Sequence, residues 1–485
     1  MKEPFDLLVI GGGINGAAIA RDAAGRGWRV LLVEAGDLAG ATSSASTKLI
    51  HGGLRYLEMY DFRLVREALK EREVMLATAQ HLVTPLRFVL PHDNAQRPAW
   101  LIRLGLMLYD RIGGRISLPR SRGLRLAGTI EGAPLRPDVT RGFAYSDAWV
   151  DDSRLVIANA RDAADRGAEV RTRCALTVAA RQDDGWRAAL SDGSVVHAKA
   201  IVNAAGPWVA EMLGRVGVAS RAATRLIKGS HIIVPRLFEG DHAYILQNAD
   251  RRIVFAIPYQ HRFTLIGTTD VACAEMPVRP EISPEEVAYL CASVNRWFRS
   301  PIAPADVVGS FAGVRSLYDD GVAESRAVTR DYVLELDREG PPILSVFGGK
   351  ITTARHLAEA AVDRLAEATG LPGTGWTAHS PLPGGGGPAV VPDWLPPAVA
   401  TRMAAAYGDR LGEVIGPARD MADLGIDFGH GLTETEVRYL IDREWARSAE
   451  DILWRRSRIG LHITEEQRIR LEHWIDERIN ERMTA

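Results

Sequence analysis

FDLLVIGGGING, residues 5–16, joins a short apolar run to closely spaced glycines. The apolar run Phe5–Ile10 predicts a buried strand. Alanine-rich helical sequence follows through Ala24, and a second apolar run, Val30–Val33, ends at Glu34. A strand, a glycine-rich turn, a helix, a second strand and an acid within about 30 residues predict a dinucleotide-binding unit.

The glycines of this motif have separate physical tasks. Gly11 permits the tight turn, Gly13 lets backbone N–H groups approach a diphosphate, and Gly16 allows close packing of the helix on the strand. The start of the helix adds orphan N–H groups and the positive end of its dipole. Glu34 can accept hydrogen bonds from an adenosine ribose and would repel a 2′-phosphate, which argues against NADP. The motif alone does not choose between NAD and FAD.

Composition excludes several classes of protein. The 485 residues carry 59 basic and 61 acidic side chains, so a nucleic-acid partner is not expected. The N-terminus lacks a signal-peptide pattern, and no apolar run is long enough for a transmembrane helix. The three cysteines, Cys174, Cys273 and Cys291, match no zinc or disulfide pattern, so we expect no metal and a reducing, intracellular compartment.

A hydroxyl-rich segment, residues 41–48, follows the first unit and leads into LIHGGLRY, residues 49–56. Its backbone and hydroxyl groups could run along a large ligand, although a flexible linker is the alternative. The second stretch gathers His51, Arg55 and Tyr56 around two glycines, which favours the ligand-binding interpretation.

The segment from Ala41 to Glu58 resembles the FAD-dependent glycerol-3-phosphate dehydrogenases of the aerobic, membrane-associated type. The resemblance continues in order along nearly the whole chain. It includes residues 147–155, 203–208, 226–231, 266–270, 346–350 and 423–425. It implies FAD as cofactor, oxidation of sn-glycerol 3-phosphate to dihydroxyacetone phosphate, and transfer of the electrons to a membrane quinone.

The resemblance also implies the fold class, α/β plus α+β. A Rossmann-like FAD-binding domain of the D-amino-acid-oxidase/glutathione-reductase type would be interleaved with an antiparallel-sheet substrate domain and followed by a C-terminal helical cap. The expected segments are 1–75, 145–225 and 340–370 for the FAD-binding domain, 76–144 and 226–339 for the substrate domain, 371–397 for a linker, and 398–485 for the cap.

Local patterns support this organisation. Short β-rich runs at 230–235, 243–247, 253–258 and 263–267 predict an antiparallel sheet. Apolar runs at 195–198, 200–204 and 344–347 predict further strands, and 283–298 and 352–369 predict helices. Ser283 with Glu286, and Thr433 with Glu436, have the spacing of a helix capping box. The C-terminal region shows no motif of catalytic type.

The resemblance transfers a set of cofactor-binding residues to this chain. The turn at 348–352 would face the negative charge of the reduced flavin, and Lys350, one of only six lysines, would add a cation. The full predicted set is Gly11, Gly13, Ile14, Asn15, Gly16, Glu34, Thr42, Ser43, Ser46, Lys48, Leu49, His51, Gly52, Gly53, Ala205, Gly206, Trp208, Gly348, Gly349, Lys350, Ile351 and Thr352.

The proposed substrate carries a phosphate, which planar, permanently charged guanidinium groups bind well. The resemblance indicates Arg55, Arg315 and Arg330 for this role, although any one arginine among so many is more often a surface residue. The full set of predicted substrate ligands is Arg55, Tyr56, Thr268, Arg315, Arg330 and Lys350.

Removal of the hydroxyl proton requires a base, for which a histidine is suited by its pKa. His231 is the favoured candidate and His51 the alternative, with Arg315 and Lys350 completing the predicted catalytic set. The chain departs from the pattern of the family at three positions. Thr47 replaces a serine, Ser316 a proline and Ala354 a tyrosine.

Residues 97–125 contain seven arginines and one acid, Asp110. Within them, Trp100, Leu104 and Leu108 would share one face of a helix, which suits a helix lying on anionic lipid. An ordinary core helix is the alternative. The membrane interpretation predicts a peripheral protein on the cytoplasmic face of the cell membrane, and a homodimer is compatible with the sequence.

The sequence is compatible with three other functions. An oxidase of the same substrate would pass electrons to oxygen, and a flavin oxidoreductase for amines or hydroxy acids would need fewer cations than Arg55, Arg315, Arg330 and Lys350 supply. A non-catalytic nucleotide-binding scaffold would keep the glycine turn without these side chains.

Overall fold

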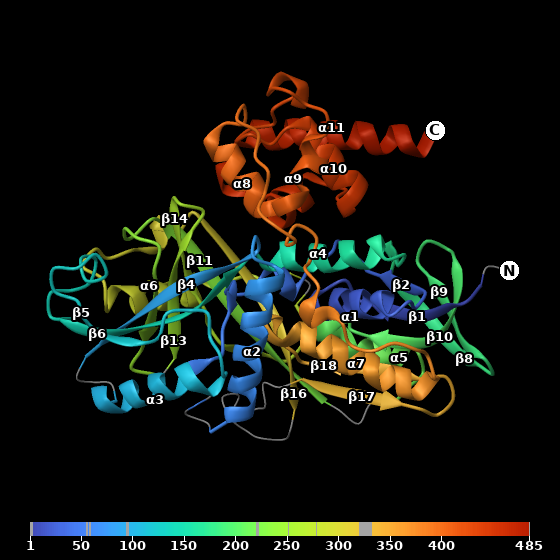
Figure 1. The fold of residues 1–485 in the computed structure, drawn as a ribbon, viewed down its shortest axis with the longest axis horizontal. Coiled ribbons are helices and arrows are strands. Elements are labelled where there is room, and N and C mark those ends of the chain that lie inside the picture. The colour runs from blue at the N-terminus through green and yellow to red at the C-terminus, as the bar shows by residue number, and fades with distance from the viewer. Residues whose placement is uncertain are drawn as a thin grey trace.

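Two mixed β-sheets with covering helices form the body of the protein, and a helical cap lies against one side of it (Figure 1). The computed structural model describes residues 3–54, 57, 60–93, 97–219, 223–250, 252–277, 279–319 and 332–484. No helix in these ranges is long and apolar enough to cross a membrane.

The first sheet is built around β1 (Phe5–Ile10), as its unbroken apolar sequence predicts. β2 and β10 flank β1 in parallel, and β18 extends the sheet in parallel beyond β10. The other strands are β2 (Val30–Val33), β7 (Glu169–Arg171), β8 (Leu176–Gln182), β9 (Gly185–Leu190), β10 (Val195–Asn203), β17 (Val333–Asp337) and β18 (Ile343–Phe347).

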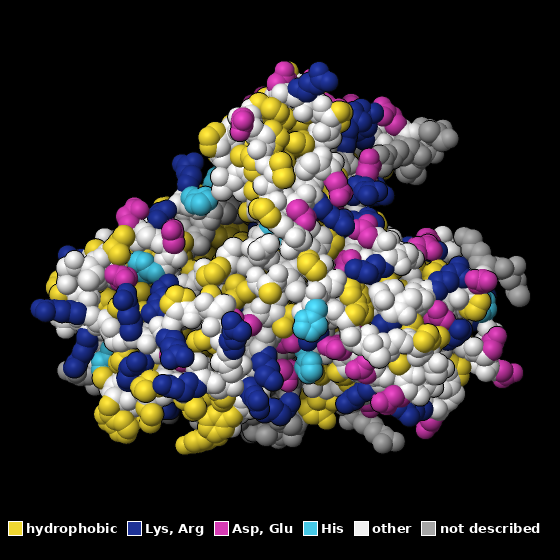
Figure 2. Space-filling view, in the orientation of Figure 1, with side chains coloured by type: hydrophobic (Ala, Val, Ile, Leu, Met, Phe, Trp, Pro, Cys, Tyr) yellow, Lys and Arg dark blue, Asp and Glu magenta, His cyan; other side chains and the backbone are white. Residues whose placement is uncertain are grey.

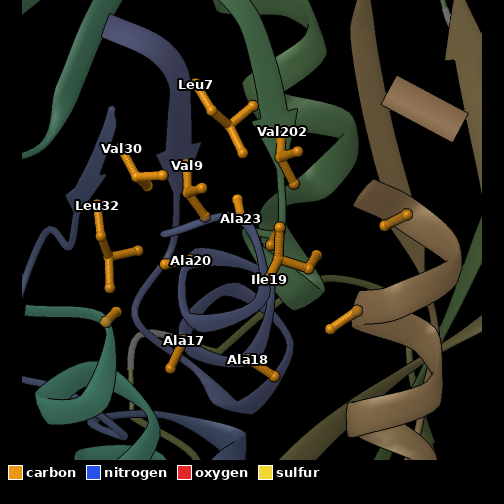
Figure 3. Packing of buried hydrophobic residues seen from close by; sticks show 14 of the residues in the cluster. Leu7, Val9, Ala17, Ala18, Ile19, Ala20, Ala23, Val30, Leu32 and Val202 are labelled. Carbon is orange, nitrogen blue, oxygen red and sulfur yellow. The ribbon is translucent and has the colours of Figure 1, made fainter. Parts of the chain in front are cut away.

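The parallel strands of this sheet are buried on both faces, because alternate side chains point to opposite sides. On one face Leu7, Val9 and Val202 pack on the alanine-rich surface of α1 (Figure 3). The helices that contribute to this face are α1 (Ile14–Gly25), α4 (Asp152–Asp165) and α7 (Ala354–Thr369). The small side chains of α1 let it lie close to the strands.

The opposite face of the first sheet is covered by smaller elements. Leu8 and Ile10 pack there with Trp186 of β9 and Leu213 of α5 (Val209–Arg215). The turns at the carboxyl ends of β1, β10 and β18 remain next to one another, which is where open α/β sheets bind ligands.

The second sheet, unlike the first, is largely antiparallel. β16 pairs with β11 along nearly its whole length. The strands are β3 (Leu49–Ile50), β4 (Val83–His92), β5 (Arg122–Arg125), β6 (Arg141–Val150), β11 (Ala223–Pro235), β12 (Ala243–Gln247), β13 (Ile253–Tyr259), β14 (Phe263–Gly267), β15 (Val271–Cys273) and β16 (Gly309–Asp319).

Helices cover both faces of this second sheet. α6 (Pro284–Asn295) packs on one face with Trp297, and α2 (Phe62–Thr78) and α3 (Ala99–Ile112) contribute to the core on the other. The predicted capping box of α6 is confirmed, since Ser283 and Glu286 exchange both hydrogen bonds.

The cap has its own apolar core. Its helices are α8 (Pro397–Tyr407), α9 (Leu411–Ile415), α10 (Glu434–Glu444) and α11 (Glu465–Thr484), with a six-residue π-helix, η9 (Asp451–Arg456). The cap lies over α4 in Figure 1. The preceding segment is held to the body, since Trp376 donates a hydrogen bond to the Asp22 carbonyl and packs on Arg21.

Some local predictions differ from the structure. The runs at 195–198 and 200–204 form one strand, β10, which includes Lys199 and ends at Asn203. The second predicted capping box is wrong: the Thr433 side chain caps no backbone N–H, and Glu436 instead binds Arg402 and Tyr407. Four strands depart from the expected domain limits. β3 joins the second sheet and β17 the first, while β6 and β11 of the second sheet run across the limits at 145 and 225.

Candidate active site

A cavity of about 1040 Å³ lies between the two sheets and reaches the cap. The turns after β1, β10 and β18 line it from one side, and β11, β13 and β16 line it from the other. This volume is at the upper end of the range for small-molecule sites, as a large, elongated ligand requires.

The glycines after β1 bring backbone to one wall of the cavity. Gly11 has φ +106°, a conformation that disfavours any side chain, and a Cβ there would strike the carbonyl of Ala204. A Cβ on Gly16 would overlap the carbonyl of Gly11, so α1 can start this close to β1 only with glycine. The Ile14 N–H donates to Ser43 Oγ at 3.0 Å, which ties the hydroxyl-rich segment to the helix start.

Glu34 marks one end of the cavity. Its Oε2 accepts from the Gly12 N–H at 2.6 Å and its Oε1 from the Gly36 N–H at 2.8 Å, while burial raises the pKa of the carboxyl. Arg173 and Ala175 line the cavity beside it. In the dinucleotide-binding unit an acid at this place binds the adenosine ribose.

Asn15 and His51 contact the predicted turn after β18. Asn15 Nδ2 donates to the Gly348 carbonyl at 3.2 Å, and the His51 N–H donates to Thr352 Oγ1 at 3.4 Å. Gly349 has φ +100°, which turns the chain between β18 and the following helical turn. Lys350 lines the cavity at this turn.

His231 occupies the wall formed by the second sheet. Its Nε2 is 3.0 Å from Thr47 Oγ1, and its ring stacks on Phe311 with centroids 4.8 Å apart. Its Nδ1 has no hydrogen-bond partner among the described residues. Burial, together with the charges of Lys48 and Arg315, lowers the pKa of His231 to about 3, so the imidazole is neutral near neutral pH.

Arg315 lies beside His231 and is held by an acid. Its Nη2 is 2.8 Å from Asp270 Oδ1, and its side chain is 36% exposed. A Cβ on Gly229 would come within 2.7 Å of Thr268 Oγ1, so glycine allows these side chains to approach the strand. The second sheet thus presents a hydroxyl, a guanidinium and a carboxylate to one part of the cavity.

A buried ion cluster lies close to His231 in this wall. Lys48 Nζ contacts Asp152 Oδ2 at 3.0 Å, and the cap residue Arg458 also binds Asp152. Burial and the charge of Arg458 lower the pKa of Lys48 to about 8, whereas Lys48 and Arg458 hold the pKa of Asp152 low. The cluster leaves Lys48 charged at neutral pH and close to His231.

The cavity brings most of the predicted residues together, but not all of them. Gly16, Lys48 and Gly52 do not line it: the two glycines are closely packed by neighbouring atoms, and Lys48 pairs with Asp152. Arg55, Tyr56 and Arg330 lie outside the described residues. The predicted residues that line it are Gly11, Gly13, Ile14, Asn15, Glu34, Thr42, Ser43, Ser46, Leu49, His51, Gly53, Ala205, Gly206, Trp208, His231, Thr268, Arg315, Gly348, Gly349, Lys350, Ile351 and Thr352.

Sequence reasoning missed several lining residues. Asp270 lies inside the quoted motif at 266–270, so its pairing with Arg315 could have been sought there. Arg252, directly before β13, carries no sequence signal. The cap residues Ser448, Glu450, Asp451 and Arg455 also line the cavity, although the C-terminal region shows no motif of catalytic type.

The donors and shape of the cavity fit FAD. The glycine wall suits a diphosphate, Glu34 suits the ribose, and the turn at 348–352 suits the far end of an extended cofactor. Asn15 Oδ1 is buried without a hydrogen-bond partner among the described residues and borders this space.

Comparison with known proteins agrees with this geometry. A family model described as FAD dependent oxidoreductase matches residues 6–355, and one described as the C-terminal domain of alpha-glycerophosphate oxidase matches 348–477. A glycerol-3-phosphate dehydrogenase of Pseudomonas aeruginosa is 53% identical, with 98% of this chain and 96% of the relative covered. A D-erythritol 1-phosphate dehydrogenase of Brucella abortus is 48% identical, with 98% and 99% covered.

A solved structure extends the likeness to three dimensions. The glycerol-3-phosphate dehydrogenase of Bacillus halodurans, complexed with FAD, superposes with a TM-score of 0.73 at 26% identity. The match covers 98% of this chain and 94% of that chain. The likeness therefore includes the cap as well as the two sheets.

Proposed function

Because this chain belongs to the FAD-dependent oxidoreductases, we propose that it oxidises sn-glycerol 3-phosphate to dihydroxyacetone phosphate. The oxidation removes a hydride from the carbinol carbon and a proton from its hydroxyl group. When bound, FAD supplies the acceptor for the hydride. The residues of the chain must then hold the phosphate, orient the carbinol and receive the proton.

His231 is the proposed base. Its neutral imidazole can accept a proton, and the contact between Nε2 and Thr47 fixes the orientation of the ring. Binding a phosphate dianion nearby would offset the positive charge of Lys48 and Arg315, which now disfavours the imidazolium. Substrate binding would therefore raise the basicity of His231 when it is needed.

Arg315 and Lys350 are the proposed cations of the site. Arg315 can donate two parallel hydrogen bonds to a phosphate, and its pairing with Asp270 fixes the side chain. Lys350 would lie near charge that develops on the flavin. His51 and Thr268 border the same space and would supply further hydrogen bonds. Arg55, Tyr56 and Arg330 remain proposed ligands on the resemblance alone.

One observation favours this function over the alternative functions. A single cavity joins the glycine wall and Glu34 to a wall that holds His231 and Arg315. A nucleotide-binding scaffold would need only the first part of this cavity. An amine or amino-acid oxidoreductase would not require a cationic wall of this kind, since its substrate lacks a phosphate.

The D-erythritol 1-phosphate relative defines the competing substrate. We would compare kcat/KM for sn-glycerol 3-phosphate, D-erythritol 1-phosphate and glycerol with an artificial electron acceptor. We expect sn-glycerol 3-phosphate to have the highest kcat/KM and glycerol almost none. A higher value for D-erythritol 1-phosphate would reject the proposed substrate and keep the proposed chemistry.

For the electron acceptor we propose a membrane quinone, with the protein bound to the cytoplasmic face of the membrane through α3. Trp100, Leu104 and Leu108 are 68%, 56% and 42% exposed, whereas Leu106 and Tyr109 of the same helix are buried. Figure 2 shows hydrophobic side chains beside basic ones over this part of the molecule. An exposed apolar helix face with arginines around it suits an anionic lipid surface.

Vesicles and acceptors test this part of the proposal. The variant Trp100→Ser/Leu104→Ser should bind vesicles that contain anionic lipid more weakly than the wild type, while Val178→Ser/Val195→Ser changes apolar side chains exposed elsewhere and should bind normally. Equal binding by all three proteins would reject α3 as the contact. Rapid peroxide formation in air, with no reduction of a soluble quinone, would favour the oxidase instead.

A further inference from the structure

The cap contributes one wall to the end of the cavity where Glu34 lies. Ser448, Glu450, Asp451 and Arg455 line the cavity from the cap, and most of them belong to or adjoin η9. The cap is thus in contact with the space that the cofactor fills.

Ion pairs fix this wall to the dinucleotide-binding unit. Arg455 Nε is 2.6 Å from Asp37 Oδ2, and Arg456 contacts the two oxygens of Asp37 at 2.5 and 2.7 Å. Asp37 stands three residues after Glu34 and is 6% exposed. Among the described residues, the carboxylate of Asp37 is therefore paired with guanidinium groups of the cap alone.

A second ion pair joins the cap to the body at the end of the cavity where Glu34 lies. Asp451 Oδ2 is 2.7 Å from Arg173 Nη2, and Asp451 Oδ1 is 2.6 Å from Arg455 Nη2. The Arg173 N–H donates to the Gly36 carbonyl at 2.8 Å, which places Arg173 beside the turn that follows Glu34. Arg455 and Asp451 therefore bridge the two segments of the body that border this end of the cavity.

The position of Glu34 identifies the part of the cofactor that this wall would face. An acid at this place of the unit binds the adenosine ribose, so the adenosine lies at this end and the flavin at the other. We propose that the cap is an adenosine clamp: Arg455 and Asp451 close the adenosine end of the cavity, and retention of FAD depends on their ion pairs with Asp37 and Arg173.

Cofactor affinity of matched variants tests the proposal. Arg455→Ala removes the bridging guanidinium, and Arg410→Ala removes another ion pair between cap and body, Arg410–Asp165, whose residues do not line the cavity. We expect Arg455→Ala to raise the Kd of the apoprotein for FAD about tenfold. Arg410→Ala should change it less than about twofold, because an exposed ion pair contributes little. Equal Kd values for the two variants would overturn the clamp.

Hydrogen exchange on the wild-type apoprotein avoids the risk that a variant fails to fold. ADP, which carries the adenosine and diphosphate but no flavin, should slow amide exchange in residues 445–458 as well as in residues 5–16. Protection of residues 5–16 without protection of residues 445–458 would reject the clamp, whether or not the proposed substrate is correct.

Discussion

At the scale of single residues, the proposed reaction depends most on His231, a buried, neutral base. We expect His231→Asn to lower kcat by about 100-fold, the usual contribution of a general base, while FAD stays bound. The measurement is steady-state turnover together with the flavin absorbance of the purified variant. His356→Gln, at a side chain 42% exposed, is the control and should behave like the wild type. Normal turnover by His231→Asn would remove this residue from the mechanism.

The depressed pKa of His231 also predicts how stability depends on pH. Between about pH 6.5 and pH 3 the unfolded chain binds a proton at this histidine and the folded protein does not. The free energy of unfolding therefore falls as the pH is lowered through this window. Urea denaturation at about pH 7 and pH 5 should show a smaller loss for His231→Asn than for the wild type. An equal loss in both proteins would contradict the depressed pKa.

The sequence predicts the types of reactive residues better than their environments. His231 and Arg315 stand in motifs that resemble the family, and both line the cavity. The pairing of Arg315 with Asp270 depends on how β11, β14 and β16 align, and the proximity of Lys48 to His231 depends on the contact of the neighbouring Thr47 with the imidazole. No local pattern in the sequence encodes that register, so the shifted pKa of His231 could not be predicted.

At the scale of elements, the start of α1 sets the shape of the cofactor wall. Because a Cβ on Gly16 would overlap the Gly11 carbonyl, Gly16→Val must push α1 away from β1. We expect loss of bound FAD and a lower denaturation temperature. Gly214→Ala is the control, since nothing lies within 4 Å of its added Cβ and the position is helical. Retention of FAD by Gly16→Val at wild-type affinity would contradict the packing argument.

Elements with a strong local signal are predicted well, and elements defined by distant partners are not. Residues 5–10 and 30–33 form strands as their apolar sequence predicts, and Ser283 caps α6 with Glu286 as their spacing predicts. Thr433 and Glu436 have the same spacing, but Glu436 binds Arg402 and Tyr407 instead. A buried carboxylate is stabilised more by a guanidinium than by a backbone N–H, so tertiary contacts prevail over the local motif.

At the scale of the whole molecule, ion pairs join the cap to the body. Arg154 of α4 and Glu444 of α10 form a buried pair that also includes a hydrogen bond from Arg154 to the Ala406 carbonyl at 2.9 Å. We expect Glu444→Met to lower the free energy of unfolding by about 3 to 5 kcal/mol, because the guanidinium is left buried and unpaired. Urea denaturation measures the change.

The double variant Arg154→Met/Glu444→Met is the control for this prediction. It removes both charges, so it should recover most of the stability that Glu444→Met loses. A double variant as unstable as the single one would show that the charges themselves hold the cap. These partners are 290 positions apart in the sequence. Such pairs could not be assigned among the many arginines of the chain, and for that reason the contribution of the cap to the cavity was missed.

The oxidation of sn-glycerol 3-phosphate by FAD in this cavity is the reaction on which the proposed function depends. Its most direct test is the visible absorbance of the purified protein without oxygen, before and after addition of that substrate. We expect a flavin spectrum that bleaches on addition and returns when a quinone is supplied. A flavin spectrum that does not change, with FAD demonstrably bound, would contradict the assigned substrate.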